Sequence, residues 1–388
     1  MSVLAVLAPG QGAQKPGFLT PWLELPGAAA RLRWWSTLAG TDLVHLGTEA
    51  DATEIKDTAK TQPLLVAAAL LAAEHLPMYD VALVAGHSVG ELGAAALAGV
   101  LSPESAVTLA GVRGREMAAA CALEPTGMAA VLGGDPDEVV AAIEAAELYA
   151  ANRNGAGQIV AAGSTEALAK FAAQPPAGAR VRPLEVAGAF HTPYMAAAER
   201  ALTAVATGIP VADPHKILLS NRDGTAVGSG VEMRQRLVAQ VTAPVRWDLC
   251  QRSLTDIGVT ALIELPPAGT LAGLAKRALS GIEILTLNTP DDLPAARDLI
   301  ARHGVVPSGE PTPQFRVVVS TAAGTFAPFA ELVEGTEVRS GQVIGQVSTR
   351  QGSVEVTAHE SGVLTEWLVH HDDPVAAGQP LARIGGQM

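Results

Sequence analysis

Short apolar runs alternate with helical patterns along residues 1–304. The runs Val3–Ala8 and Val81–Ala85 consist of Val, Leu and Ala, as strands buried on both faces of a parallel sheet often do. We expect further strands of this sheet at residues 217–220, 262–265 and 284–287. Strands that alternate with helices over this length predict an α/β fold with a parallel sheet.

The pattern changes between residues 126 and 186. We expect strands at 128–132, 148–152, 158–162 and 180–184, and helices at 135–146 and 164–173. The resulting order, β-α-β-β-α-β, is that of the ferredoxin-like unit. The sequence therefore predicts a small ferredoxin-like subdomain at 126–186, inserted into a larger domain made of residues 1–125 and 187–304.

Two helices of the larger domain have boundary signals. The segment Gln62–Leu76 is apolar over much of its surface, and Pro63 would lie in its first turn, where proline is tolerated. Ser102 followed by Pro103 predicts the start of another helix, with the serine as its cap.

The last part of the chain has a different composition and sequence pattern. Residues 305–314, VVPSGEPTPQ, are polar and rich in proline, which is typical of a linker. Short strands are expected beyond it at 316–319, 343–347, 354–357, 362–368 and 380–384, separated by Gly, Asp and Pro turns. Residues 315–388 therefore predict a small all-β, barrel-like domain.

The stretch Gly86-His87-Ser88-Val89-Gly90 joins a predicted strand to an Ala/Leu-rich helix. A serine with glycine two residues away on each side, at such a junction, has the pattern of a nucleophile elbow. The sharp turn would lift the Ser88 hydroxyl out of the sheet and point the first amides of the helix, including that of Val89, at an oxyanion. The alternative is a glycine-rich turn whose serine only caps the helix.

Composition excludes several classes of function. The net charge of −13 argues against a nucleic-acid partner. No apolar stretch is long enough to cross a bilayer, so no membrane association is expected. Two cysteines, Cys121 and Cys250, form neither a disulfide framework nor a metal-ligand cluster, and no basic residue precedes the first apolar run. We therefore expect a cytoplasmic protein with no bound metal.

Several motifs occur together in one order. They are PGQG around Gln11, GHSVGE around Ser88, VRGREM around Arg113, NRNGAGQIVAAG from Asn152, GAFHTPYM around His191, QVTAPVRW from Gln240 and ELPPAGTLAGLAKR from Glu264. With these motifs, the chain resembles the malonyl-CoA:acyl-carrier-protein transacylases over roughly residues 1–300. The resemblance implies an α/β-hydrolase-like core and, as substrates, malonyl-CoA and an acyl carrier protein of fatty acid or polyketide synthesis.

The resemblance also implies roles for individual residues. Ser88 would be the nucleophile and His191 its general base, oriented by the main-chain carbonyl of Gln240. The amides of Gln11 and Val89 would bind the tetrahedral oxyanion, and no metal or organic cofactor would be needed. Arg113 would bind the free carboxylate of the malonyl group through two parallel hydrogen bonds, which favours malonyl over acetyl. Phe190 resembles the residue of the malonyl-type specificity pattern.

Other functions stay open at this point. A related acyltransferase could move a different acyl group, from acyl-CoA or an acyl carrier protein, in polyketide synthesis. A thioesterase or esterase would share the elbow but would need an acid between Ser88 and His191. Asp135 and Asp137 lie there, but they fall in the inserted subdomain and suit a helix cap better. A non-catalytic binding protein is a further alternative.

The C-terminal domain resembles biotinyl/lipoyl carrier domains. In those domains the cofactor is attached to a lysine in the turn between the two halves. Here the turn is Ser348-Thr349-Arg350-Gln351-Gly352, and Gln351 lies roughly where the lysine belongs. The last lysine of the sequence is Lys276, so we expect no attached biotin or lipoate. The domain would be a docking module for a carrier protein or a carboxylase subunit, or a passive appendage.

Overall fold

A computed structural model describes residues 2–304, 315–359 and 361–385. The predicted linker at 305–314 lies outside the described residues. The described residues form two compact units, one from residues 2–18 and 46–304 and the other from residues 19–45 and 315–385. The predicted domain boundaries stay a prediction, and each unit is considered by itself.

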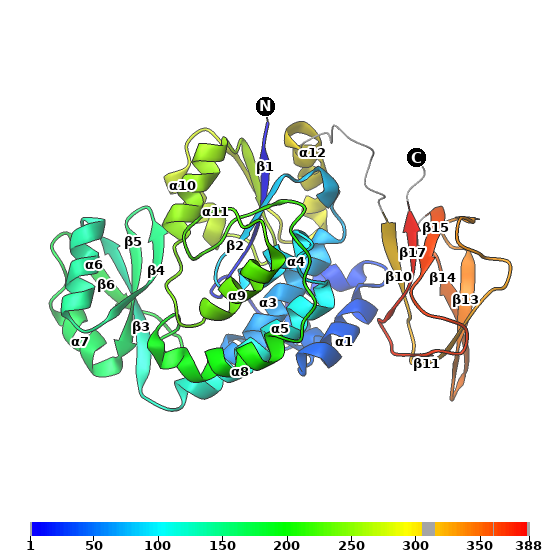
Figure 1. The fold of residues 1–388 in the computed structure, drawn as a ribbon, viewed down its shortest axis with the longest axis horizontal. Coiled ribbons are helices and arrows are strands. Elements are labelled where there is room, and N and C mark those ends of the chain that lie inside the picture. Colours follow the sequence, from blue (N-terminus) through cyan, green and yellow to red (C-terminus); the bar gives the residue numbers. More distant parts are fainter. Residues whose placement is uncertain (1, 305–314, 360, 386–388) are drawn as a thin grey trace. The chain divides into compact units, whose positions relative to one another are not determined.

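The core of the first unit is a five-stranded sheet in which every pair is parallel, as the sequence predicts (Figure 1). The strand order is β7-β2-β1-β8-β9. The strands are β1 (Leu4–Ala8), β2 (Leu83–Gly86), β7 (Ile217–Leu218), β8 (Ala261–Glu264) and β9 (Glu283–Thr286). The β1 strand lies at the centre with β2 beside it, and both are buried along their whole length, which explains their continuous apolar sequence.

Helices cover both faces of this sheet (Figure 1). On one side α4 (Gly90–Leu97) packs on β1 and β2, and behind it lie α3 (Thr58–Ala73) and α5 (Pro103–Cys121). On the other side α10 (Trp247–Ile257) and α11 (Thr270–Ala278) supply apolar residues to a shared core with the strands. Outside residues 126–183 the same unit also contains α8 (Ala196–Ala206), α9 (Gly230–Ala239) and α12 (Leu293–His303), and α2 (Leu43–Thr48) includes residues assigned to each unit.

Two helix boundaries can be compared with their predictions. The Ser102 hydroxyl accepts a hydrogen bond from the Ser105 amide, which confirms the predicted cap of α5. The predicted start of α3 is wrong, because the helix begins at Thr58 and Pro63 lies inside it. The Asp57 carboxylate caps this earlier start by accepting the Ala59 amide, and nearly all of the helix is buried, so packing outweighs the lost proline donor.

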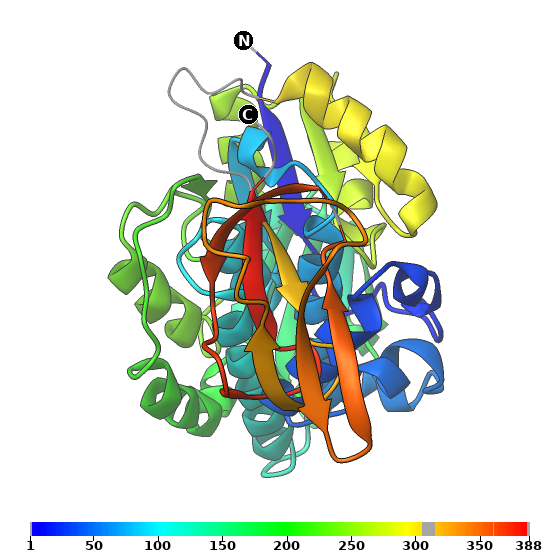
Figure 2. The ribbon, with the colours of Figure 1, turned by 90° about the vertical axis from the view of Figure 1, so that its right-hand side faces the viewer.

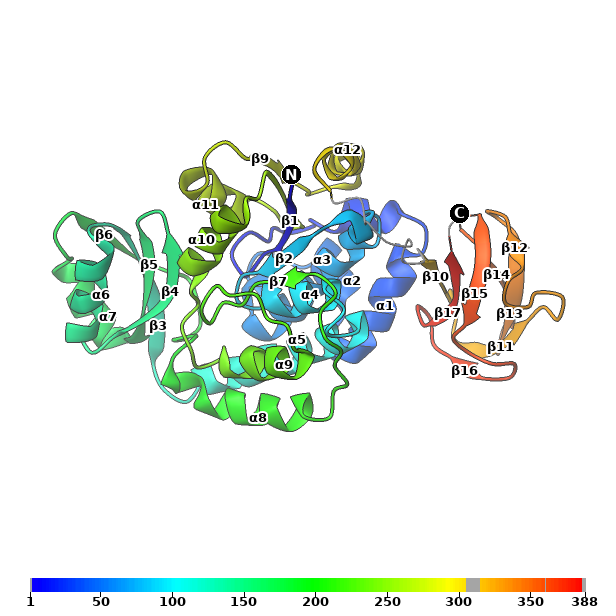
Figure 3. The same cartoon turned by 45° about the horizontal axis from the view of Figure 1, so that its top comes forward.

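Residues 126–183 form the ferredoxin-like arrangement that the sequence predicts. Its four strands are all antiparallel in the order β4-β5-β3-β6, and two helices cover one face (Figure 3). The elements are β3 (Thr126–Gly133), α6 (Pro136–Ala145), β4 (Tyr149–Gly155), β5 (Gln158–Ser164), α7 (Thr165–Ala173) and β6 (Ala179–Pro183).

The C-terminal residues form two four-stranded antiparallel sheets around one apolar core (Figure 2). One sheet has the order β10-β17-β15-β12 and the other β14-β13-β11-β16. The strands are β10 (Phe315–Val319), β11 (Gly324–Pro328), β12 (Glu337–Val338), β13 (Val343–Thr349), β14 (Gly352–Thr357), β15 (Gly362–Trp367), β16 (Pro374–Val375) and β17 (Pro380–Gly385). In the β13–β14 hairpin Thr349 pairs with Gly352, so Arg350 and Gln351 form the tip.

The same unit contains α1 (Ala28–Ala39) and the short helical turn at Thr20–Glu24. Within the described parts of both units, no helix combines the length and the apolar character needed to span a membrane.

Candidate active site

A tight turn between β2 and α4 presents Ser88. The residue has φ of 53°, in the left-handed region that side chains other than glycine rarely adopt. The turn is possible because both flanking residues lack a Cβ atom. A Cβ on Gly86 would lie 2.1 Å from the carbonyl of Gly90, and one on Gly90 would lie 2.2 Å from the carbonyl oxygen of Ala8. The turn therefore has the geometry of a nucleophile elbow.

His191 lies against this serine. Its Nε2 atom is 2.7 Å from Ser88 Oγ, and its Nδ1 atom is 2.8 Å from the main-chain oxygen of Gln240. Because a carbonyl can only accept, Nδ1 carries the proton and Nε2 is free to accept one from the hydroxyl. Burial, with a further contribution from the positive charge of Arg113, lowers the pKa of His191 to about 3. The imidazole is therefore neutral at physiological pH.

Arg113 is brought to the same place by α5. Its side chain is only 2% exposed, and its Nη2 atom lies 3.4 Å from Ser88 Oγ. Nη1 donates to Gln62 Oε1 at 2.6 Å, and Nη2 donates to Gln240 Oε1 at 2.9 Å. Within the described part of the chain no carboxylate forms an ion pair with Arg113. Desolvation lowers the pKa of the guanidinium to about 10, so it stays charged and retains donors for an anion.

A glycine explains how Arg113 reaches the site. A Cβ on the next residue, Gly114, would lie 2.8 Å from the main-chain oxygen of Thr58. The two helices α3 and α5 therefore approach closely at this point. This approach places Gln62 of α3 within hydrogen-bonding distance of the guanidinium.

Two main-chain amides near the elbow have no acceptor among the residues that the structure describes. They belong to Val89, which is 1% exposed, and to Gln11 in the turn after β1. That turn lies against the elbow, because a Cβ on Gly10 would be 2.8 Å from the main-chain oxygen of His87. A buried amide without an acceptor is unfavourable, so Val89 suits a site where negative charge develops on an oxygen.

The neighbouring His87 has a structural environment. Its Nε2 atom lies 2.9 Å from Asn154 Oδ1, and its ring contacts Trp247 edge-on at 5.5 Å between centroids. Burial lowers the pKa of His87, so this ring is neutral.

Phe190 is buried and directly precedes His191 in the chain. The specificity role that the resemblance gives to Phe190 stays a prediction.

Besides Gln62, two further residues of the site were not predicted from the sequence. The Asn221 side chain accepts the Ser88 amide at 2.8 Å and donates to the Gly86 oxygen at 2.7 Å, so it fixes both ends of the elbow. Glu91 accepts hydrogen bonds from the Asn221 amide and from the Gln240 side chain. One signal was available for Asn221, which follows a strand of a parallel sheet and so lies at the same sheet edge as Ser88.

Comparison with known proteins first identifies the class of protein to which the chain belongs. Residues 7–296 match the family described as "Acyl transferase domain", and residues 317–384 match the one described as "Biotin-requiring enzyme". The first match covers most of the chain and includes Ser88, His191 and Arg113. The chain is therefore an acyl transferase domain protein with a second, biotinyl/lipoyl-type domain.

Individual relatives narrow this class. The malonyl CoA-acyl carrier protein transacylase of Mycobacterium tuberculosis is 55% identical over 296 residues, which are 75% of this chain and 98% of that protein. The Escherichia coli transacylase of the same name is 33% identical over 320 residues, 77% of this chain and 100% of that protein. The chain belongs to the malonyl CoA-acyl carrier protein transacylase family.

Solved structures of related proteins agree with this family assignment. The crystal structure of MCAT from Mycobacterium tuberculosis has a TM-score of 0.73 and 53% identity, covering 76% of this chain and 99% of that one. A type II PKS acyl-carrier protein in complex with its malonyl-transacylase gives a TM-score of 0.70 and 29% identity, covering 77% and 100%. These likenesses confirm the predicted α/β core.

Proposed function

We propose that this chain transfers a malonyl group from malonyl-CoA to the phosphopantetheine thiol of an acyl carrier protein, through an ester on Ser88. The transacylase relatives support the overall reaction. The single observation that carries the residue roles is the position of Arg113. It is a buried cation without an ion pair in the described residues, 3.4 Å from a hydroxyl that itself bonds His191.

In the first half-reaction His191 Nε2 takes the hydroxyl proton of Ser88 as Oγ attacks the thioester carbonyl. The resulting oxyanion accepts hydrogen bonds from the amides of Val89 and Gln11. The carbon–sulfur bond then breaks, and the imidazolium returns its proton to the departing CoA thiolate. The main-chain oxygen of Gln240 holds Nδ1–H throughout, so the ring keeps one tautomer and one orientation.

The second half-reaction reverses these steps with a different thiol. His191 takes the proton of the phosphopantetheine thiol, the sulfur attacks the Ser88 ester, and the same amides stabilise the second oxyanion. Collapse breaks the ester bond, and the proton returns to Ser88 Oγ. The malonyl group leaves on the carrier protein, as a ping-pong mechanism requires.

Arg113 accounts for the choice of acyl group. Of its five N–H donors, two are used by the amide oxygens of Gln62 and Gln240, which leaves donors for a carboxylate. The carboxylate of a malonyl group would gain charge-assisted hydrogen bonds inside a buried site. An acetyl group cannot pair with the guanidinium, so it gains none of this stabilisation.

The wider assignment is part of the same proposal. Residues 1–125 and 187–304 form the large catalytic domain, 126–186 the inserted subdomain and 315–388 a docking or structural module that carries no biotin or lipoate. A cytoplasmic location is supported by the two free cysteines, Cys121 and Cys250. Both fatty acid and polyketide synthesis remain within the proposal.

The test uses the full-length protein and malonyl-CoA labelled in the malonyl group. After a brief incubation without carrier protein, digestion and mass spectrometry should place the label on the peptide that contains Ser88. Addition of a holo acyl carrier protein should remove the label and transfer it to the carrier. The matched variant S88A should take up no label. Label on a different residue, or release only as free malonate, would refute the proposal.

A further inference from the structure

Glu91 is a buried carboxylate close to the reacting groups that the mechanism above does not use. It lies in the first turn of α4 and is 1% exposed. One carboxylate oxygen accepts the main-chain amide of Asn221, and the other accepts the side-chain Nε2 of Gln240. Within the described residues it forms no ion pair. An ionised group in such a place needs these donors, because burial of an unpartnered charge is costly.

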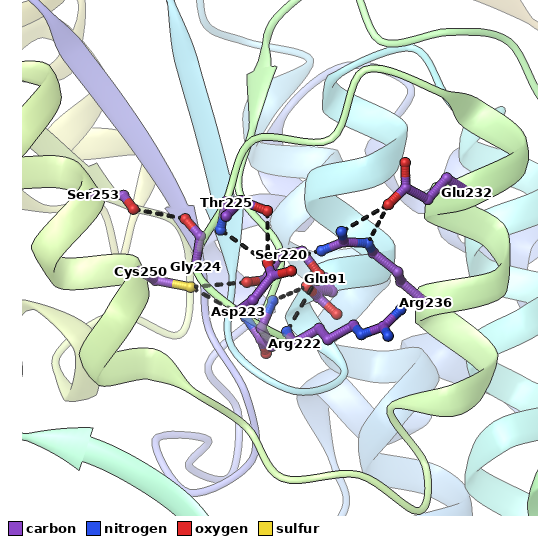
Figure 4. A network of polar contacts seen from close by, with 11 residues as sticks. Glu91, Ser220, Arg222, Asp223, Gly224, Thr225, Glu232, Arg236, Cys250 and Ser253 are labelled. Carbon is purple, nitrogen blue, oxygen red and sulfur yellow. Dashed lines mark hydrogen bonds and ion pairs between the residues drawn. The ribbon is translucent and has the colours of Figure 1, made fainter.

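The loop that faces Glu91 is firmly held (Figure 4). Asp223 Oδ1 accepts both the amide and the hydroxyl of Thr225, and Arg236 Nη1 donates to the same oxygen at 2.8 Å. The Gly224 amide donates to the Ser220 oxygen at 2.8 Å, and the Ser253 hydroxyl donates to the Gly224 oxygen at 2.7 Å. The Asn221 amide is therefore a fixed donor, and it determines which oxygen of Glu91 remains for Gln240.

The Gln240 side chain connects this carboxylate to the substrate-binding cation. Among the residues that the structure describes, its Nε2 atom faces only acceptors: Glu91, the main-chain oxygen of Ser88 at 3.2 Å, and the Asn221 side-chain oxygen at 3.3 Å. Its Oε1 atom accepts from Arg113 at 2.9 Å. The amide therefore has one favourable orientation. The positive charge of Arg113 and the negative charge of Glu91 are linked through this single neutral amide and do not touch.

We propose that Glu91 is a positioning residue that fixes the orientation of the Gln240 amide and balances the charge of Arg113 from one amide away. A carboxylate in direct contact with Arg113 would occupy the donors that a malonyl carboxylate requires. Placed behind Gln240, the same charge stabilises the cation and leaves those donors available. This inference rests on the proposed function, since it concerns how that site selects a malonyl group.

The isosteric change E91Q exposes this role through its hydrogen bonds. If the new amide accepts the Asn221 amide with its oxygen, its NH2 group faces Gln240 Nε2, and two donors oppose each other. Rotation of the Gln240 amide relieves that conflict but turns its NH2 group toward the guanidinium of Arg113. Without rotation the opposed NH2 groups displace the Gln240 amide, and with rotation Arg113 loses its acceptor on Gln240; the Gln240 carbonyl that holds His191 belongs to the main chain and stays in place.

The experiment measures acylation of the full-length protein by malonyl-CoA and by acetyl-CoA at pH 8. Burial raises the pKa of Glu91 to about 7, so this pH keeps the carboxylate ionised. For E91Q we expect the malonyl-to-acetyl ratio of kcat/KM to fall about 10-fold, through a higher KM for malonyl-CoA, as the loss of a charge-assisted hydrogen bond implies. The rate with acetyl-CoA should change by less than about 3-fold.

If E91Q does not fold, the double variant E91Q/Q240E is used to test the inference. The amide introduced at position 91 can donate to the new carboxylate at position 240, which also accepts from Arg113, so part of the lost Tm should return. The two longer contacts of Gln240 Nε2 are not replaced, so the recovery is incomplete. The malonyl preference should stay low, because a carboxylate now contacts Arg113 directly.

Glu264 supplies a matched control for simple loss of stability. It is also a fully buried carboxylate of the same unit, and it accepts the amides of Gly269, Leu271 and Ala272. E264Q should lower Tm and leave the malonyl-to-acetyl ratio unchanged. The inference is overturned if E91Q keeps the wild-type ratio, if E264Q changes the ratio equally, or if the double variant prefers malonyl as the wild type does. Failure of the wild type to accept malonyl at all would instead refute the proposed function.

Discussion

The Nη2 atom of Arg113 and the Oγ atom of Ser88 lie 3.4 Å apart, although one residue belongs to α5 and the other to the turn before α4. A cation this close to a nucleophile can hold one end of a short diacid while the other end reacts. The distance therefore ties substrate choice to the reacting atom, and a change at Arg113 should affect one acyl group far more than another.

Replacement of Arg113 by alanine should reduce kcat/KM for malonyl-CoA by about 100-fold, since loss of a buried, hydrogen-bonded charge partner costs about 3 kcal/mol. Acylation by acetyl-CoA should be retained or improved. Rates of Ser88 labelling with the two thioesters provide the measurement. The matched control is R115A, on the same helix at an exposed position, which should behave as the wild type. Equal losses for both thioesters in R113A would contradict the assignment.

Replacement of Asn221 by alanine should have a different signature. The variant N221A removes the acceptor of the Ser88 amide and the donor to the Gly86 oxygen, so the elbow loses its support for every substrate. We expect kcat to fall about 10-fold or more with both malonyl-CoA and acetyl-CoA, at an unchanged ratio, and Tm to decrease. The control N288A removes an acceptor of the Ala268 amide outside the site. A change in the acyl-group ratio would indicate that Asn221 acts through Arg113.

The rate of Ser88 acylation by acetyl-CoA should depend little on pH between about 5 and 8. His191 has its pKa lowered to about 3, by burial first and by Arg113 and His87 in addition, so its proton-accepting form persists when the pH falls below 6.5. Single-turnover acylation across this range provides the measurement. A one-proton loss of rate centred near pH 6.5 would show that the imidazole titrates as it does in water.

A methyl group at Gly90 should prevent the elbow from forming. In G90A the added Cβ would lie 2.2 Å from the Ala8 oxygen and 2.8 Å from the Pro9 oxygen, both rigid main-chain atoms. We expect a loss of about 3 kcal/mol or more, seen as a large decrease in Tm or as insoluble protein. The control G93A lies one helical turn away, where the new Cβ would meet the Ala8 side chain at an ordinary 3.5 Å. Equal effects of the two variants would show that the turn is not constrained as described.

The C-terminal domain should remain unmodified by biotin ligase. Incubation of the full-length protein with ligase, ATP and biotin, followed by intact-mass measurement, should give no adduct, since the sequence has no lysine after Lys276. The variant Q351K places an amine at the tip of the β13–β14 hairpin and tests whether the fold alone allows attachment. An adduct on the wild-type protein would refute the proposal that this domain carries no cofactor.

Features that depend on residues close together in the sequence could be predicted from it. Glycine at position 86 is required by a contact with Gly90 inside the same turn, and the buried strands β1 and β2 have continuous apolar sequences. The α10 helix was missed although Trp247, Cys250 and Leu254 are spaced along one helical face and are buried.

Relationships between distant residues could not be predicted in the same way. Glu91 and Asn221 are 130 positions apart, and a glutamate in the first turn of a helix is usually explained by the helix dipole alone. Gln62 lies in an apolar helix, and only the close approach at Gly114 reveals its partner, Arg113. The predicted start of α3 is wrong for a related reason, because burial of nearly the whole helix outweighs the local signal of Pro63.

Ser88 and His191 both have φ in the left-handed region, 53° and 61°, where a residue with a Cβ is disfavoured by roughly 1 kcal/mol. Glycine would fit the main chain better at both positions. A search for heat-resistant variants guided by backbone preference alone would therefore nominate S88G and H191G among its first choices. Those variants would lack the two reacting groups, so both positions should be kept fixed in any such library.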